Sequence, residues 1–195
     1  MKQLALIGIL AILVLGCGGP KTYTQQEERA FEQLQQLVNN KRLDIQSNRA
    51  RPMATNAFMQ VANSNLLGPG NTASSIDLTT NQNRLVIEGD SIRGYFPYFG
   101  EVQFGGGYRG GNHQGIEFND VPEAYSVEFD EQKHRAEVNF KIRDQYRTNE
   151  TYNIYMTLFP NGSSNVRVQS SNRTPIEFSG NYKALKEEDP KAMNP

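Results

Sequence analysis

Hydrophobic residues recur at three- and four-residue spacing in one stretch near the start of the chain, which predicts an amphipathic α-helix. Its apolar positions are Ala30, Phe31, Leu34, Leu37 and Val38. Thr24 and Glu27 form the pattern of a capping box, in which each side chain hydrogen-bonds a backbone N–H of the first turn. We expect the helix to start at Thr24, to end near Asn39-Asn40 and to pack on the domain; a free-standing stalk is the alternative.

After this helix the spacing of apolar residues changes to two, the period of a half-buried β-strand. Turn residues separate short strand-like segments around Leu43–Ile45, Arg84–Glu88, Ile92–Phe96, Tyr125–Phe129, Ala136–Ile142, Tyr152–Phe159, Asn165–Gln169 and Pro175–Tyr182. Asn161-Gly162 is a strong hairpin signal because both residues tolerate positive φ. Residues 54–67 fit a short helix and an extended chain equally well.

These patterns predict a mainly β fold, an antiparallel β-sandwich or barrel-like sheet with one N-terminal amphipathic α-helix. A parallel α/β architecture is not expected, because no amphipathic helices separate the later strands.

The first residues carry a different pattern, with Lys2 followed by an unbroken run of apolar residues and glycine from Leu4 to Leu15. This run matches a secretory signal peptide and is shorter than the roughly 20 residues that a membrane-spanning helix needs. Val14-Leu15-Gly16-Cys17 resembles the lipobox that lipoprotein signal peptidase cleaves, so Cys17 is the expected acylated residue. We therefore expect a signal peptide (1–16), a lipidated tether (17–23), a single β-rich domain (24–183) and a flexible C-terminal tail (184–195).

The charge balance and the cysteine content limit the classes of partner that this chain can bind. Its 20 basic and 21 acidic residues leave no basic excess to hold a nucleic acid. Cys17 is the only cysteine, so no internal disulfide can form. Acyl chains on Cys17 would bind a membrane, since each buried methylene contributes about 0.8 kcal/mol.

Six sequence segments together resemble a known family. They are Leu67–Asn71, Gly89–Ser91, Tyr95–Glu101, Gly105–Tyr108, Gly115–Phe118 and Leu158–Gly162. This ordered set resembles a family of Bacteroidota lipoproteins and secreted proteins known as domain of unknown function 4251, over roughly residues 27–183. The resemblance implies a cell-envelope protein of a Gram-negative bacterium and carries over no catalytic or binding residues.

A second resemblance predicts on which side of the outer membrane the protein lies. Surface-exposed lipoproteins of these bacteria resemble one another in an acidic cluster after the acylated cysteine, and Gly18–Thr22 has none. We therefore expect an outer-membrane lipoprotein on the periplasmic face.

Ser91 is the strongest candidate for a nucleophile. Gly89-Asp90-Ser91-Ile92 resembles the Gly-Asp-Ser-Leu block of a class of esterases, which also need a histidine base, usually three residues after an aspartate. The only histidines are His113 and His134, and Asp130 lies four residues before His134. We expect no catalytic residues, and an ordinary polar turn at Ser91.

The remaining motifs predict no cofactor and no metal site. Gly105-x-Gly107-x-x-Gly110 fits a dinucleotide-binding pattern, but the residues that follow cannot continue as the helix that this pattern requires. His113 and His134 each lack a second ligand at the spacing of zinc sites, so we expect both to be solvated turn residues.

Tyr95–Gly111 is the most unusual segment in composition, because it combines aromatic residues with six glycines. We expect it to form the ligand or partner surface, through Tyr98, Phe99, Tyr108 and Arg109, if these side chains are exposed. The alternative is that the aromatic residues belong to the core and the glycines permit a bulge or a bend of the sheet.

Asp90-Ser91-Ile92 also resembles the acceptor motif of general O-glycosylation in these bacteria. Ser91 is therefore a candidate for O-glycosylation, and an unmodified polar turn is the alternative.

Taken together, the sequence favours a membrane-anchored envelope lipoprotein with a non-enzymatic binding or scaffolding domain. Its partner would be an envelope protein, a glycan or a small apolar ligand. A serine hydrolase acting on envelope material and a carrier of a small apolar ligand are the alternatives.

Overall fold

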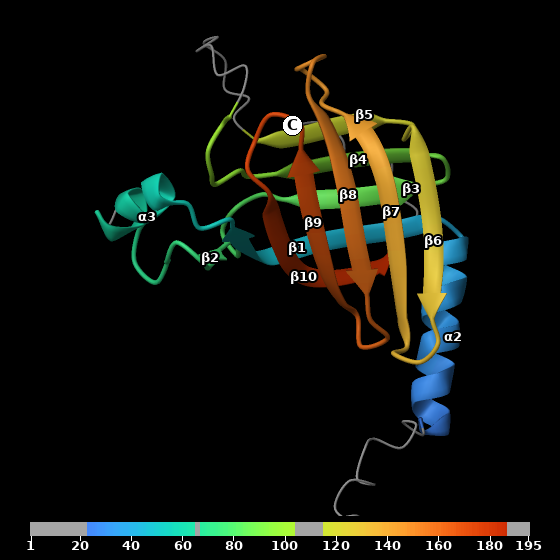
Figure 1. Cartoon of the computed structure of the whole chain (residues 1–195). Coiled ribbons are helices and arrows are strands. Elements are labelled where there is room, and N and C mark those ends of the chain that lie inside the picture. Colours follow the sequence, from blue (N-terminus) through green and yellow to red (C-terminus); the bar gives the residue numbers. More distant parts are fainter. Residues whose placement is uncertain (1–22, 65–66, 104–114, 187–195) are drawn as a thin grey trace, which may run out of the picture.

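The computed structural model describes residues 23–64, 67–103 and 115–186, which form one curled antiparallel sheet with two helices (Figure 1). The helices are α2 (Gln25–Asn39) and α3 (Asn56–Asn63). The strands are β1 (Arg42–Pro52), β2 (Ile76–Asp77), β3 (Arg84–Glu88), β4 (Ser91–Phe96), β5 (Ile116–Asp120), β6 (Ala124–Asp130), β7 (Arg135–Arg143), β8 (Thr151–Leu158), β9 (Ser163–Ser170) and β10 (Ile176–Ala184). The predicted mainly β, antiparallel, barrel-like fold is confirmed.

The order of the strands explains the curl. It runs β5-β4-β3-β1-β10-β9-β8-β7-β6, with the short β2 paired to β1. In Figure 1 the strands β1, β3, β4 and β5 lie behind β6–β9 and cross them, and β10 bends from one layer to the other. The sheet is therefore a half-barrel whose two ends face each other across a shared core.

Alternation along each strand fills that core. In β7 and β8 every second side chain is buried: Ala136, Val138, Phe140, Ile142, Tyr152, Ile154, Met156 and Leu158. Aromatic rings join the two layers. Phe96 stacks on Phe178 with centroids 4.6 Å apart, and Phe118 of β5 lies 6.2 Å from Phe140 and 6.1 Å from Tyr152.

The sheet bends where β1 crosses β10. The register shifts between Ser47 and Arg49, which leaves Asn48 as the extra residue of a β-bulge, and a bulge sharpens the local twist. Gly180 pairs with Ser47, and a Cβ atom there would lie 2.1 Å from the Gln46 carbonyl oxygen. The two backbones approach this closely only because residue 180 has no side chain.

The N-terminal helix forms as predicted and closes one side of the half-barrel. Thr24 accepts a hydrogen bond from the Glu27 N–H, while the Glu27 carboxylate accepts one from the Thr24 N–H at 2.8 Å. Phe31, Leu34 and Val38 are buried against the domain, where each contributes about 1.5–3 kcal/mol. The helix therefore packs on the sheet and is not a free-standing stalk.

His134 differs from its prediction as a solvated turn residue. Its side chain is only 8% exposed, and its ring stacks on Tyr23 at 3.4 Å and on Phe31 at 4.7 Å between centroids. The helix start and the β6–β7 turn meet at this point, and that contact covers the imidazole. Sequence spacing gave no sign of it, because residues 23 and 134 are brought together only by the fold.

Three further local features go beyond the sequence patterns. Residues 56–63 of the ambiguous stretch form α3, whose first turn is capped by Thr55. The strand β5 was not predicted, since it is only five residues long and follows a glycine-rich stretch of the sequence. The expected tail from residue 184 starts too early, because Ala184 pairs with Leu43 and Leu185 is buried.

Within the described ranges, no helix has the length and apolar character required to span a membrane.

Candidate functional site

The segment predicted as a binding surface lies partly inside the described structure. Tyr98 and Phe99 are half-buried and pack against the hydrophobic core. Tyr108 and Arg109 lie outside the described residues, as does His113. For Tyr98 and Phe99 the structure thus favours the alternative in which these aromatic residues belong to the core.

Tyr98 is held by contacts on both its ring and its hydroxyl. The hydroxyl lies 2.9 Å from the Glu101 carbonyl oxygen and 2.9 Å from Thr174 Oγ1. The Arg173 guanidinium lies over the ring at 4.9 Å from its centroid, a cation–π contact. Burial raises the pKa of Tyr98, and its hydrogen bonds with Thr174 act in the opposite direction. Tyr98 therefore joins the core to a set of buried charges.

The buried charges form a polar cluster at the end of the sheet opposite the start of α2 (Figure 1). At its centre, Arg173 Nε lies 2.8 Å from Glu150 Oε1, with both side chains at most 2% exposed. Ser170 donates to the Glu150 carboxylate at 2.6 Å. The Tyr152 hydroxyl donates to Asp144 at 2.5 Å. Burial raises the pKa of Glu150 and of Tyr152 above their usual ranges.

This cluster closes the half-barrel. Arg173 donates to the carbonyl oxygen of Gly115 at 2.9 Å, directly before β5. The Gln145 N–H donates to the Glu117 carbonyl oxygen at 2.8 Å, which joins the loop after β7 to β5. The carboxylate oxygens of Asp144 and Glu150 accept hydrogen bonds from protein donors. The cluster therefore has the contacts of a structural clamp between distant strands, and it leaves no carboxylate pair open to a substrate.

Ser91, the candidate nucleophile and glycan acceptor, is the exposed first residue of β4. Gly89 and Asp90 form the two-residue turn before it, with Gly89 at φ 61°. Lys41 binds the Asp90 carboxylate at 2.8 Å and lowers its pKa. The described histidine, His134, contacts Tyr23 and Phe31. Ser91 is thus accessible to a modifying enzyme, and the described residues supply it with no histidine base.

The described part of the chain also lacks a cluster of metal-ligating side chains. Among residues 23–64, 67–103 and 115–186, no three His, Cys, Asp or Glu side chains lie together as a metal site would require.

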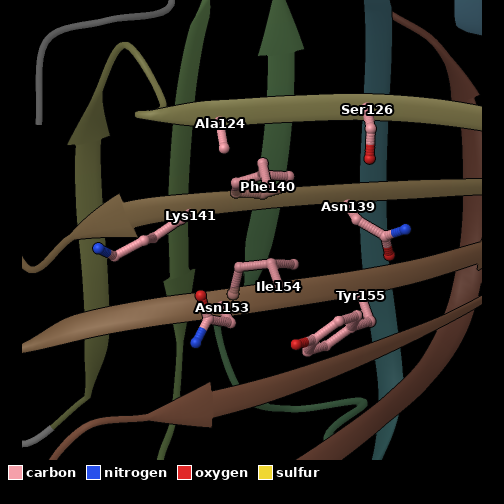
Figure 2. Close-up of a pocket in the computed structure, with 8 residues that line it drawn as sticks. All are labelled: Ala124, Ser126, Asn139, Phe140, Lys141, Asn153, Ile154 and Tyr155. Carbon is pink, nitrogen blue, oxygen red and sulfur yellow. The ribbon is translucent and has the colours of Figure 1, made fainter.

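The outer face of strands β6–β8 carries a hollow that no sequence motif indicated (Figure 2). Its volume is about 180 Å³, and its rim is formed by Ala124, Ser126, Asn139, Lys141, Asn153 and Tyr155. Figure 2 shows the Tyr155 ring lying along this face, with its hydroxyl pointing toward Asn153. We call these six residues the Tyr155 hollow.

Strand register brings the Tyr155 hollow together. Ser126 pairs with Asn139, Asn139 with Tyr155, and Tyr155 with Arg167, so that one polar row crosses four strands. Alternation within the predicted strands would have placed each of these residues on the outer face. Their alignment depends on the pairing between strands, which no single segment of the sequence reveals.

Comparison with known proteins gives the family. The model of the family described as "Domain of unknown function (DUF4251)" matches residues 25–182, nearly the whole described domain. The chain belongs to the DUF4251 family. No curated protein matches this DUF4251 chain.

A solved structure supports the fold of the DUF4251 chain. It is the crystal structure of a DUF4251 family protein from Bacteroides eggerthii DSM 20697, with a TM-score of 0.52 and 14% sequence identity. The match covers 84% of this chain and 93% of that chain. The resemblance found in the sequence is confirmed, together with its link to the Bacteroidota, while the low identity limits the likeness to the fold.

The clamp function of the polar cluster can be tested by breaking its central ion pair. Arg173→Met should lower the free energy of unfolding by about 3–5 kcal/mol, because Glu150 would stay buried with its closest cation removed and only Arg147, at 3.5 Å, left beside it. The double variant Arg173→Met/Glu150→Gln should be more stable than the single variant. Denaturant unfolding measures both.

The pH dependence gives an independent control. In Arg173→Met the folded state should keep the Glu150 proton at pH values where the unfolded state, with a pKa near 4.5, has lost it. The stability of the single variant should therefore fall as the pH rises above about 4.5, and the double variant should lack this loss. Equal stabilities of the two variants over this range would show that the ion pair does not clamp the sheet.

Proposed function

We propose that this chain is an envelope lipoprotein, anchored through acyl chains on Cys17, whose folded domain binds a partner without catalysis. The signal-like run before Cys17 supports the anchor. Cys17 itself lies outside the described residues. The outer membrane, on its periplasmic face, is the proposed location.

One observation carries the binding function. A row of exposed polar side chains without hydrogen-bond partners among the described residues lies on the outer face of β6–β8, around Tyr155, whose exposed fraction is 43%. The buried carboxylates Asp144 and Glu150 are instead bound to Tyr152 and Arg173 in the polar cluster. An open polar face suits recognition, whereas a hydrolase needs a nucleophile beside an oriented base.

No observation on the described residues supports the hydrolase or the ligand-carrier alternative to the same extent. The hydrolase alternative lacks a described base near Ser91. The carrier alternative needs an interior cavity, and aromatic side chains fill the described core between the layers. The Tyr155 hollow and a second hollow of about 170 Å³ beside Lys41 and Tyr125 are both smaller than the 300–1,000 Å³ typical of small-molecule sites.

The anchor is tested by Cys17→Ser. This variant should lose the acylated residue and either leave the membrane fraction or accumulate as the uncleaved precursor. Fractionation of cells followed by intact-mass measurement distinguishes these states from the wild type. A Cys17→Ser protein that is processed normally and stays with the membrane would contradict the anchor.

The absence of hydrolase chemistry is tested with a fluorophosphonate probe, which labels activated serines. The purified wild-type protein should not be labelled, and Ser91→Ala should give the same result. Intact mass reports the labelling, and the same spectra show whether Ser91 carries a glycan. Labelling of the wild type that disappears in Ser91→Ala would replace the binding function with a hydrolase.

A further inference from the structure

We propose that the Tyr155 hollow is a subsite for a neutral sugar unit of a glycan. This inference rests on the proposed binding function of the outer face of β6–β9 and names the chemical class of its ligand. It is carried by the hydrogen-bonding groups of the hollow, its charge and its shape.

The polar groups of the hollow are free to bind a ligand. Among the described residues, the side chains of Ser126, Asn139, Asn153 and Tyr155 have no hydrogen-bond partner. Each primary amide offers two donors and an acceptor, and each hydroxyl offers both functions. Sugar hydroxyls also donate and accept, so closely spaced amides and hydroxyls match them better than a set of donors alone would.

The Tyr155 ring supplies the apolar part of such a site. It is 43% exposed and lies along the sheet, with Asn139 and Asn153 beside it (Figure 2). A tyrosine presents an apolar ring and a polar tip at a small cost in side-chain entropy. The C–H face of a sugar ring can cover the tyrosine ring while the sugar hydroxyls reach the amides.

The charge of the hollow favours a neutral ligand. Lys141 is the only charged residue on the rim, and its ammonium lies 3.1 Å from the Glu123 carboxylate. A hollow of about 180 Å³ on the outer face of the curled sheet holds one small unit of a longer chain. A nucleic acid would need more basic charge than Lys141 supplies.

The other outer face of the half-barrel carries more paired charge. On β1, β3 and β4, the Asp44 carboxylate is bound by Arg84 at 2.9 Å and by Lys183 at 3.3 Å. Glu88 pairs with Arg93 at 3.1 Å in the same way. These groups bind one another, so the two outer faces differ in what they offer to a ligand.

The test is a printed array of defined neutral and carboxylated oligosaccharides, probed with the full-length protein purified in detergent. We expect binding to at least one neutral oligosaccharide, followed by titration calorimetry with that sugar. Tyr155→Ala and the pair Asn139→Ala/Asn153→Ala should each lower its affinity about tenfold or more, because each removes several contacts. Tyr155→Phe should lose less affinity than Tyr155→Ala, since the ring remains and only the hydroxyl is removed.

Asn119→Ala, on the outer face of β5, is the matched control and should leave the affinity unchanged. All variants should keep the wild-type melting temperature, because the altered side chains lie outside the core. An array without neutral sugar binding, binding limited to carboxylated sugars, or affinities unaffected by the Tyr155 and asparagine variants would overturn the proposal. Those outcomes would leave the anchored binding function standing, because its tests with Cys17 and Ser91 involve no sugar.

Discussion

A single sheet that must bury its own apolar face is the constraint on which this structure depends. Within the described residues the domain has no second sheet and only α2 covers its side, so the strands curl until one half of the sheet covers the other. The bulge after Ser47 and the missing side chain of Gly180 permit that bend. Once one face is buried in this way, all polar recognition is left to the outer faces.

Closing the curl requires a clamp at its open end. There the sheet edges β5 and β6 are not hydrogen-bonded to each other, and Arg173 instead connects Gly115 to Glu150. The buried pair contributes specificity more than net stability, because burying two charges costs about as much as their attraction returns. It joins the start of β5 to the start of β8, while the backbone ladders of β6–β9 hold the register that aligns the Tyr155 hollow.

Local sequence signals predicted the helices and strands, but they did not predict the pairing between distant segments. The capping box at Thr24 and the Asn161-Gly162 turn identified the helix and a hairpin because their physics acts within a few residues. The burial of His134 beside Tyr23, and the alignment of Asn139 with Tyr155, depend on register and on contacts across the fold. The sequence therefore indicated an anchored β domain, while the candidate site required the structure.

The central claim is that the outer face of β6–β9 is the working surface of the anchored domain. Because Cys17 is the only cysteine in the chain and is proposed to be acylated, an introduced cysteine is the single free thiol. The rate of maleimide labelling can then be compared between intact cells and purified protein for Asn153→Cys and, as a control, Asn119→Cys. The account predicts several-fold slower labelling in cells at position 153 only. Equal ratios at the two positions would contradict it.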